Sequence, residues 1–364
     1  MAVGYDSPER CDVGACVQNT CADEGCDGPE DCPAPAAPVC RMGACSSGMT
    51  ACESAGGRIV FVSNRDGDED ILTMHADGTA VSAITLNGVS DRSPSWSPSG
   101  EAVAFRRQTQ GGAYDVFVMD SDGTNASNVT QNPESQDHFA WSRSGTSLAF
   151  ATGTVDEFVS YVINLDGSAL SPLGGRSFSA RPSFSPDGTK VAYWAYDTQS
   201  TGGIFAIAAD GSAGLAMLGP VAAPIRALSW SPDGSQLAYV EGVAGAGDIW
   251  TRDASGANPR NLTMTADDET DVVWSPDGTT LVFVRAGEIW SVLPDGTGPA
   301  NLTKNAAFDD GPVFSADGAH IFFTSDRDGN REVYRMGRDG SNPVNLTRHP
   351  ANDDQPDWAG CPAQ

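Results

Sequence analysis

The sequence predicts an all-β fold, a seven-bladed β-propeller of four-stranded antiparallel blades, over residues 58–364. Two turns and one apolar run recur together. The first turn reads Trp-Ser-Pro-Asp-Gly or a close variant, an apolar run ending in an aromatic residue follows it, and a second Gly-containing turn comes later. The first turn begins at Trp96, Trp141, Phe184, Trp230, Trp274 and Phe314, with a truncated copy at Trp358. Repeats of about 43 residues holding four short strands are typical of propeller blades.

Each repeat supplies its four strands in a fixed order. The innermost strand A precedes the Ser-Pro-Asp-Gly turn, and strands B, C and D follow. Runs such as residues 115–120 and 248–253 alternate apolar and polar side chains, which is the period of a half-buried strand. In the turn, proline presets φ, aspartate bonds back to the backbone and glycine takes positive φ. We therefore expect antiparallel meanders joined by tight turns.

The two ends of the propeller region do not coincide with the ends of a blade. The region enters at a B strand, residues 59–63, and finishes on an A strand, residues 355–358. The last strand should therefore complete the first blade together with the first three strands. Such closure removes the exposed strand edges that would otherwise promote aggregation.

Residues 1–57 differ in composition and form a predicted cysteine-rich leader. Eight of the nine cysteines lie here, and the ninth is Cys361. The apolar content is too low for a core, so a disulfide-stapled unit is expected, and the absence of a Cys-x-x-Cys pair and of histidine argues against zinc. Blade topology places Cys52 and Cys361 on the same face of the ring, and we predict a disulfide between them. One further cysteine should then remain without an intramolecular partner.

The cysteine usage also bears on location, because disulfides persist in oxidising compartments. Residues 1–10 lack the apolar segment of a signal peptide. We expect that an export or lipoprotein signal was removed or lies upstream, which gives a periplasmic, cell-surface lipoprotein or secreted protein. The longest uncharged run, residues 211–225, is too short to cross a bilayer and contains two prolines, so no transmembrane segment is predicted.

Charge restricts the partners. Asp and Glu number 48 against 21 Lys and Arg, a formal net charge of -27. Such a surface repels phosphate backbones and anionic membranes, so nucleic acid is excluded as a partner. Cations, basic peptides and basic protein surfaces are attracted. We expect a monomer that binds a protein or basic peptide.

The D–A loops vary most and should rim one mouth of the central channel. Most of their charged residues are acids, interrupted by two arginines. The candidate mouth residues are Asp91, Asp137, His138, Arg181, Arg226, Glu269, Asp271, Asp309, Asp310, Asp353 and Asp354. The set predicts a socket for a basic peptide or a cation site, with Asp91, Asp310 and Asp354 as the candidate Ca²⁺ ligands; no other cofactor is predicted. The alternative is that these acids cap loops through side-chain-to-backbone hydrogen bonds.

The B–C loop of the first repeat, residues 64–70 (NRDGDED), has the acidic spacing of a calcium loop. It lacks the twelve-residue length and terminal Glu of an EF-hand. Residues 326–330 fill the same position in the last repeat. The preferred interpretation is therefore a hairpin turn.

The repeats resemble the TolB-type propeller repeat, a WD40-like module. The resemblance rests on the Ser-Pro-Asp-Gly turns and on residues 325–330 (SDRDGN), 332–334 (EVY) and 345–347 (NLT), and it extends over residues 58–360. It implies a propeller of the bacterial cell envelope that binds other molecules without catalysis. TolB itself resembles a six-bladed propeller with an additional N-terminal domain, whereas seven repeats and a leader occur here, so the particular partner of TolB is not implied.

Catalytic signatures are missing: the sequence contains no Gly-x-Ser-x-Gly, His-Glu-x-x-His or P-loop lysine motif. Some seven-bladed relatives are pectate-type lyases with a manganese site built of histidines. The four histidines here, His75, His138, His320 and His349, are expected in different blades and layers. We therefore predict no catalytic residue and a non-enzymatic binding or scaffold propeller, with a metal-dependent polysaccharide lyase or another carbohydrate-active enzyme as the alternative.

Overall fold

The computed structural model describes residues 39–41, 44–46, 57–154, 157–173, 181–196, 201–210, 212 and 216–359. The chain divides into two compact units, residues 1–57 and 58–364. In the first, β1 (Val39–Arg41) and β2 (Ala44–Ser46) form a two-stranded antiparallel sheet. The predicted partners Cys52 and Cys361 both lie outside the described residues. No helix that could span a membrane occurs in the described part of the chain.

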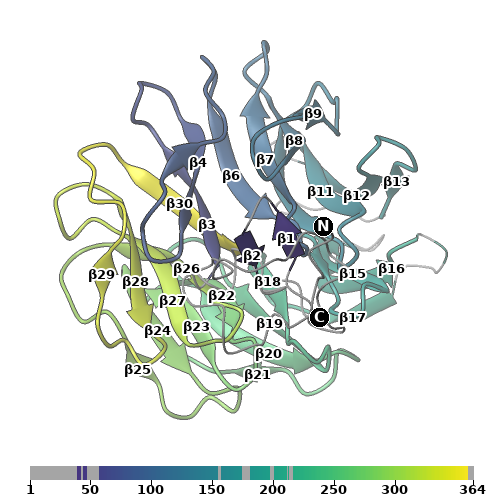
Figure 1. The fold of residues 1–364 in the computed structure, drawn as a ribbon. Helices are drawn as coiled ribbons and strands as arrows, with labels where there is room; N and C mark the ends of the chain where they lie inside the picture. Colours follow the sequence, from purple (N-terminus) through teal and green to yellow (C-terminus); the bar gives the residue numbers. More distant parts are fainter. Residues whose placement is uncertain are drawn as a thin grey trace, which may run out of the picture. The chain divides into compact units, whose positions relative to one another are not determined.

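The second unit is a ring of seven four-stranded antiparallel sheets, as predicted (Figure 1). We number the blades from the first along the chain. Blade 1 contains β30 (Asp353–Ala359), β3 (Arg58–Ser63), β4 (Asp70–His75) and β5 (Ser82–Ala83). Blade 2 contains β6 (Asp91–Trp96), β7 (Ala102–Gln108), β8 (Tyr114–Asp120) and β9 (Ser127–Asn128). Blade 3 contains β10 (Gln136–Trp141), β11 (Ser147–Thr154), β12 (Glu157–Asn164) and β13 (Ser171–Pro172).

The remaining blades repeat this order. Blade 4 contains β14 (Ser183–Phe184), β15 (Lys190–Tyr196), β16 (Gly202–Ala208) and β17 (Ala216–Pro220). Blade 5 contains β18 (Ile225–Trp230), β19 (Gln236–Glu241), β20 (Asp248–Asp253) and β21 (Arg260–Asn261). Blade 6 contains β22 (Glu269–Trp274), β23 (Leu281–Arg285), β24 (Glu288–Val292) and β25 (Ala300–Asn301). Blade 7 contains β26 (Asp309–Phe314), β27 (His320–Ser325), β28 (Glu332–Gly337) and β29 (Val344–Asn345).

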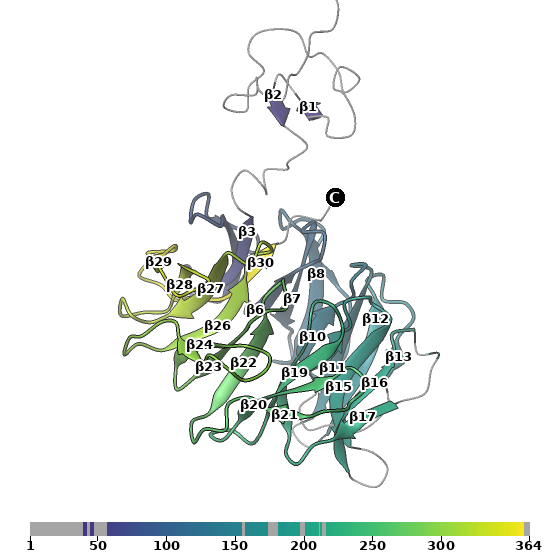
Figure 2. The ribbon, with the colours of Figure 1, turned by 90° about the horizontal axis from the view of Figure 1, so that it is seen from below.

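The predicted closure of the ring is confirmed. Strand β30 pairs antiparallel with β3, with Ile59 opposite Trp358 and Ser63 opposite Asp353. The purple start and the yellow end of the propeller therefore lie in one sheet (Figure 2). Both edges of β3 are hydrogen-bonded, to β30 and to β4, as those of an interior strand should be.

The Ser-Pro-Asp-Gly turns stabilise the A–B hairpins through their own side chains. In blade 5 the Ser231 hydroxyl donates to Asp233 Oδ1 at 2.6 Å, and Ser231 Oγ accepts from the backbone N–H of Gln236 at 2.9 Å. Gly234 adopts a φ of 71°, which few other residues tolerate. The turn thus fixes the register of the two strands it joins.

Neighbouring blades are joined by apolar clusters and by hydrogen bonds between sheets. Val60 and Ile71 of blade 1, for example, pack in one buried cluster with Trp96 and Phe105 of blade 2. The indole N–H of Trp274 in blade 6 donates to the carbonyl of Ser229 in blade 5 at 3.3 Å. Trp141 and Trp230 make the equivalent bond to their preceding blades. Burial of both faces of each sheet is what a single repeat could not achieve.

Candidate functional site: the central cavity and its surrounding ion pairs

The innermost strands surround a cavity of about 520 Å³. It is lined from β6, β7, β10, β18, β22, β26 and β30, together with Arg181, which precedes β14. The wall is mixed: Phe139, Leu228, Val272 and Val313 are apolar, and several neighbours are charged. Pockets in propellers and other proteins that combine an apolar wall with a few polar groups are the usual ligand sites.

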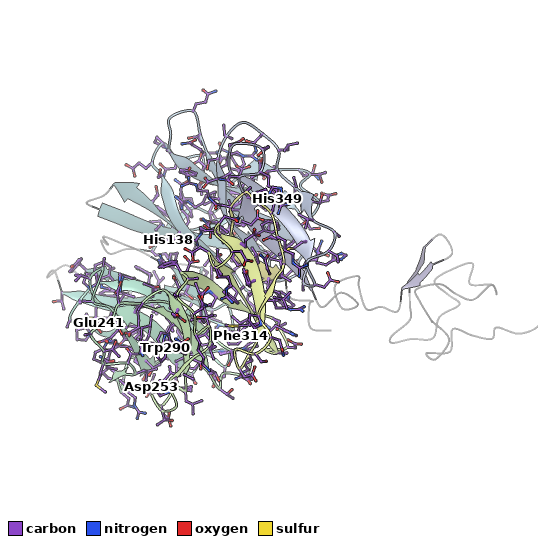
Figure 3. All side chains as sticks on the ribbon, turned by 90° about the vertical axis from the view of Figure 1, so that its left-hand side faces the viewer. His138, Glu241, Asp253, Trp290, Phe314 and His349 are labelled. Carbon is purple, nitrogen blue, oxygen red and sulfur yellow. The ribbon has the colours of Figure 1, made fainter. Side chains whose placement is uncertain are left out.

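Three charged or titratable groups predicted at the mouth line this cavity. His138 lies on β10 (Figure 3), Arg181 lies before β14 and Asp271 lies on β22. The Nη1 of Arg181 is 4.0 Å from Oδ1 of Asp271, and the side chains are 41% and 39% exposed. Because they belong to blades 4 and 6, this pair spans two blades that are not neighbours. Its exposure makes the pair weak and separable by a ligand.

His138 is neutral at ordinary pH. Burial, together with the smaller effects of the positive charges of Arg181 and Arg106, lowers the pKa of its imidazole to about 3. Arg106, from β7, also lines the cavity, and its guanidinium lies 5.0 Å from the ring centre of Tyr114. Sequence analysis missed Arg106 because it lies at a B-strand position rather than in a D–A loop. The cavity therefore combines two arginines and a neutral imidazole with two carboxyl groups, those of Asp271 and Asp357.

Four of the predicted mouth acids are fully buried instead of lining the cavity. Each is the first residue of an A strand and pairs with an arginine that lies near the end of the neighbouring B strand or in the B–C loop that follows it. The pairs are Asp91–Arg107 (2.7 Å), Glu269–Arg285 (2.8 Å), Asp309–Arg327 (3.0 Å) and Asp353–Arg65 (2.7 Å). Each acid is 0% exposed. These acids stabilise their blades and face arginine in place of a ligand.

The remaining mouth acids that the structure describes are also paired. Arg331 lies between Asp310 and Asp354, at 2.7 Å from the first and 2.8 Å from the second. Burial raises the pKa of the Asp310 carboxyl, and Arg331 partly offsets that rise. Arg226 pairs with Asp268 and donates to the carbonyl of Glu269 at 3.0 Å. The side chain of Asp137 lies outside the described residues.

The three candidate calcium ligands are therefore not brought together. Asp91 contacts Arg107, whereas Asp310 and Asp354 contact Arg331. Among the described residues, the group of three carboxylates close enough to share a metal ion is Asp66, Asp68 and Asp70, in the β3–β4 hairpin. The sequence analysis had interpreted this hairpin as a turn. The turn is present, with the Gly67 N–H donating to the Asn64 carbonyl at 3.3 Å, and it also gathers the three acids.

The histidines do not converge on a site. His75 ends β4 and His138 lies on β10, but His320 begins β27 and His349 follows β29. The last two therefore share blade 7, which corrects the expectation of four different blades. Of the four, His138 lines the cavity.

Comparison with known proteins bears on the family. Residues 46–224 match the family described as the TolB beta propeller domain. The protein TolB homolog of Chlorobium luteolum is 27% identical over 139 residues, which are 38% of this chain and 31% of that relative. Both matches support a TolB-like β-propeller family for this chain. The match thus covers under a third of the TolB homolog's length.

Solved structures show the same fold at low sequence identity. TolB from Acinetobacter baumannii superposes with a TM-score of 0.53 and 17% identity, over 84% of this chain and 67% of that one. An oligogalacturonate lyase from Vibrio parahaemolyticus gives a TM-score of 0.61 and 14% identity, over 77% of this chain and 86% of that one. At these identities the likeness is one of fold, and fold does not determine function.

Proposed function

We propose that this TolB-like chain is a non-enzymatic binding propeller of the bacterial cell envelope that holds a segment of a partner protein in its central cavity. The observation that carries the proposal is the cavity wall. Arg181 and Asp271 face each other across it, Arg106 and His138 lie nearby, and Phe139 provides apolar contact. Such a wall suits a peptide with both charged and apolar side chains.

The pairing of the mouth acids changes the expected partner. From the sequence, a protein, a basic peptide or a cation was expected at a mouth lined by carboxylates. With arginine against Asp91, Asp309, Asp310 and Asp354, the attraction left for a basic peptide comes from the overall charge of -27 and from the cavity acids Asp271 and Asp357. We infer that the surface charge guides a partner toward the propeller, while the cavity itself selects a segment bearing a carboxylate near Arg181.

The location in the envelope is part of the proposal. The relationship to a TolB homolog supports a periplasmic setting, and the cysteine-rich residues 1–57 support an oxidising compartment. The lyase alternative rests on the likeness of fold alone. Its histidine metal site has no counterpart in the described structure, where His138 alone among the histidines lines the cavity.

Site-specific photo-crosslinking in the envelope of the source organism tests the proposal. The crosslinker p-benzoylphenylalanine replaces Gln355, an exposed residue of the cavity wall on β30, and in a control it replaces Ser127, an exposed residue of the outermost strand β9. We expect a discrete protein adduct from position 355 and none of the same mass from position 127. Arg181→Gln should lower its yield. Absence of an adduct at 355, or identical adducts at both positions, would overturn the proposal.

A further inference from the structure

The β3–β4 hairpin of blade 1 gathers three carboxylates, two of which have a buried oxygen without a hydrogen-bond donor. Asp66, Asp68 and Asp70 each place an oxygen within 4.8 Å of the others. Asp70 is 2% exposed. Its Oδ1 accepts from the Thr85 hydroxyl at 2.9 Å, but its Oδ2 is buried without a hydrogen-bond partner, as is Oδ2 of Asp68. Buried carboxylate oxygens that face one another without a donor destabilise a fold unless a positive charge accompanies them.

Blade 7 contains the same hairpin with every acid satisfied. Asp328 accepts from the Tyr334 hydroxyl and from Nδ2 of Asn345 at 2.7 Å. The amide of Asn330 donates to Oε1 of Glu332 at 3.1 Å. The Thr347 hydroxyl donates to Oε2 of Glu332. In this blade Asp328 and Glu332 are satisfied by neutral donors and need no ion.

Blade 1 has lost three of these donors. The repeat aligns residues 66, 68 and 70 with residues 328, 330 and 332, because Ser63 opposes Asp70 as Ser325 opposes Glu332. The pairing of residues 72 and 83 in blade 1 likewise matches that of residues 334 and 345 in blade 7. The amide of Asn330 is therefore replaced by a carboxylate, that of Asp68. The other donors, Tyr334 and Asn345, are replaced by Leu72 and Ala83.

Two further blades show that the D-strand asparagine, which Ala83 replaces in blade 1, is a regular part of the repeat. In blade 2, Nδ2 of Asn128 donates to Oδ2 of Asp115 at 2.6 Å. In blade 5, Nδ2 of Asn261 donates to Oδ2 of Asp248 at 2.8 Å. Asp115 and Asp248 hold the strand-C position of Asp70. Blade 1 keeps an aspartate, Asp70, at this position but has Ala83 in place of the asparagine donor.

We propose that the hairpin of blade 1 is a Ca²⁺ site whose carboxylate ligands come from Asp66, Asp68 and Asp70. Hard divalent cations take oxygen ligands, and Ca²⁺ accepts six to eight of them in flexible geometry. The Asn330 amide in blade 7 also donates to the carbonyls of His349 and Ala351, at 2.9 and 2.7 Å. The corresponding residues of blade 1 are 87 and 89, and in the proposed site their backbone carbonyls would complete the set.

The electrostatics of the hairpin agree with this geometry. Burial and, to a smaller extent, the neighbouring Asp66 and Asp68 raise the pKa of the Asp70 carboxyl to about 6, against the opposing effect of the Thr85 hydrogen bond. A bound cation would relieve the repulsion among the acids.

The site also has a defined place in the assembly of the ring. The Asp91 N–H, at the start of blade 2, donates to the carbonyl of Glu69 at 2.6 Å, and the Glu69 carboxylate contacts Arg92. An ion that orders the hairpin therefore orders the junction between blades 1 and 2. The proposal concerns the hairpin and does not depend on the function proposed for the central cavity.

Calcium titration of the complete chain tests the site. Protein freed of metal with EDTA is titrated with CaCl2 by calorimetry at 0.15 M KCl, and its thermal unfolding is followed with and without saturating CaCl2. We expect a saturable site that the hairpin variants below weaken or abolish, and a rise in Tm of at least about 3 °C. The same concentration of MgCl2 should produce a smaller rise, because Mg²⁺ demands stricter geometry. No saturable binding, or an unchanged Tm, would overturn the proposal.

A repair variant assigns the binding to the hairpin. Asp68→Asn with Ala83→Asn restores two donors of blade 7, and it should abolish the calcium-induced rise in Tm and raise the Tm of the metal-free protein. Asp66→Asn alone should weaken calcium binding at least tenfold and covers the case in which the double variant does not fold. Asp122→Asn, at an exposed acid of the β8–β9 turn, should leave binding unchanged. A full calcium response in the hairpin variants would refute the assignment.

Discussion

The fully buried carboxylate of Asp91 accepts two hydrogen bonds from the guanidinium of Arg107, at 2.7 and 2.8 Å. The two residues oppose each other in the β6–β7 register. The Asn87 amide adds a third bond, at 2.7 Å, so the carboxylate is well satisfied. The same acid–arginine pairing recurs in blades 1, 6 and 7. It is a structural element of the repeat.

Removing the arginine of this pair should be strongly destabilising. Arg107→Ala leaves the Asp91 charge buried without its partner and removes the guanidinium from beside Phe105 and Phe117. We expect a loss of about 3–5 kcal/mol in the free energy of unfolding, measured by urea denaturation. Arg348→Ala, at an exposed arginine, should change it by less than about 0.5 kcal/mol. Equal effects of the two substitutions would contradict this account.

The second glycine turn should tolerate no side chain where it meets the preceding blade. Gly123 has a φ of 88°, and a Cβ there would lie 2.2 Å from the carbonyl oxygen of Ile84 in blade 1. Gly112 has a similar φ of 81° but nothing within 4 Å. Gly112→Ala should cost about 1 kcal/mol from the backbone alone, and Gly123→Ala should lower Tm clearly further. If the Gly112→Ala and Gly123→Ala variants had the same Tm, blades 1 and 2 would be able to move apart at this contact without loss of stability.

Each hydrogen bond from an indole N–H to the neighbouring blade should contribute modestly to the free energy of unfolding. Trp274→Phe keeps an aromatic ring, as blade 7 does with Phe314, but removes the donor to Ser229. We expect a loss of about 1 kcal/mol in chemical denaturation, in addition to the loss of apolar area common to any Trp→Phe change. In the described structure the buried indole nitrogen of Trp96 has no hydrogen-bond partner, so Trp96→Phe is the matched control. The prediction fails if Trp96→Phe is the more costly change.

The free energy of unfolding should decrease as the pH is lowered, because His138 is protonated more readily in the unfolded chain. Its pKa is about 3 in the folded protein and about 6.5 when unfolded, so the unfolded chain takes up the proton first as pH falls. The contribution is complete above about pH 6.5 and is lost progressively as pH falls toward 3. Because His138 is only half-buried, the loss from pH 7.5 to 5.5 should be at most about 1.4 kcal/mol. It is measured by urea unfolding at both pH values, and His138→Gln should reduce it.

The sequence was sufficient for the fold because the repeat is local. Each Ser-Pro-Asp-Gly turn fixes its own hairpin, and counting strands from residues 59–63 to 355–358 predicted the closure by β30. The site was harder to predict. Asp91 was interpreted as a ligand because its partner is 16 residues away on the next strand, and the arginines of the four pairs occupy two different repeat positions, which hides the pattern in the sequence. The Arg181–Asp271 approach joins non-adjacent blades and has no signal in a single sequence.

The pairing of β30 with β3 has a consequence for biogenesis. Arg65 and Asp353, which are 288 residues apart, meet only when the final strand has been delivered. Until translation or export reaches β30, β3 exposes an unpaired edge, and contacts of such sequence separation form slowly. A nascent or truncated chain is then an incomplete ring that can accept the last strand of a second copy. Quality control of this protein should therefore respond to loss of its last few residues more strongly than to loss of any single outer strand.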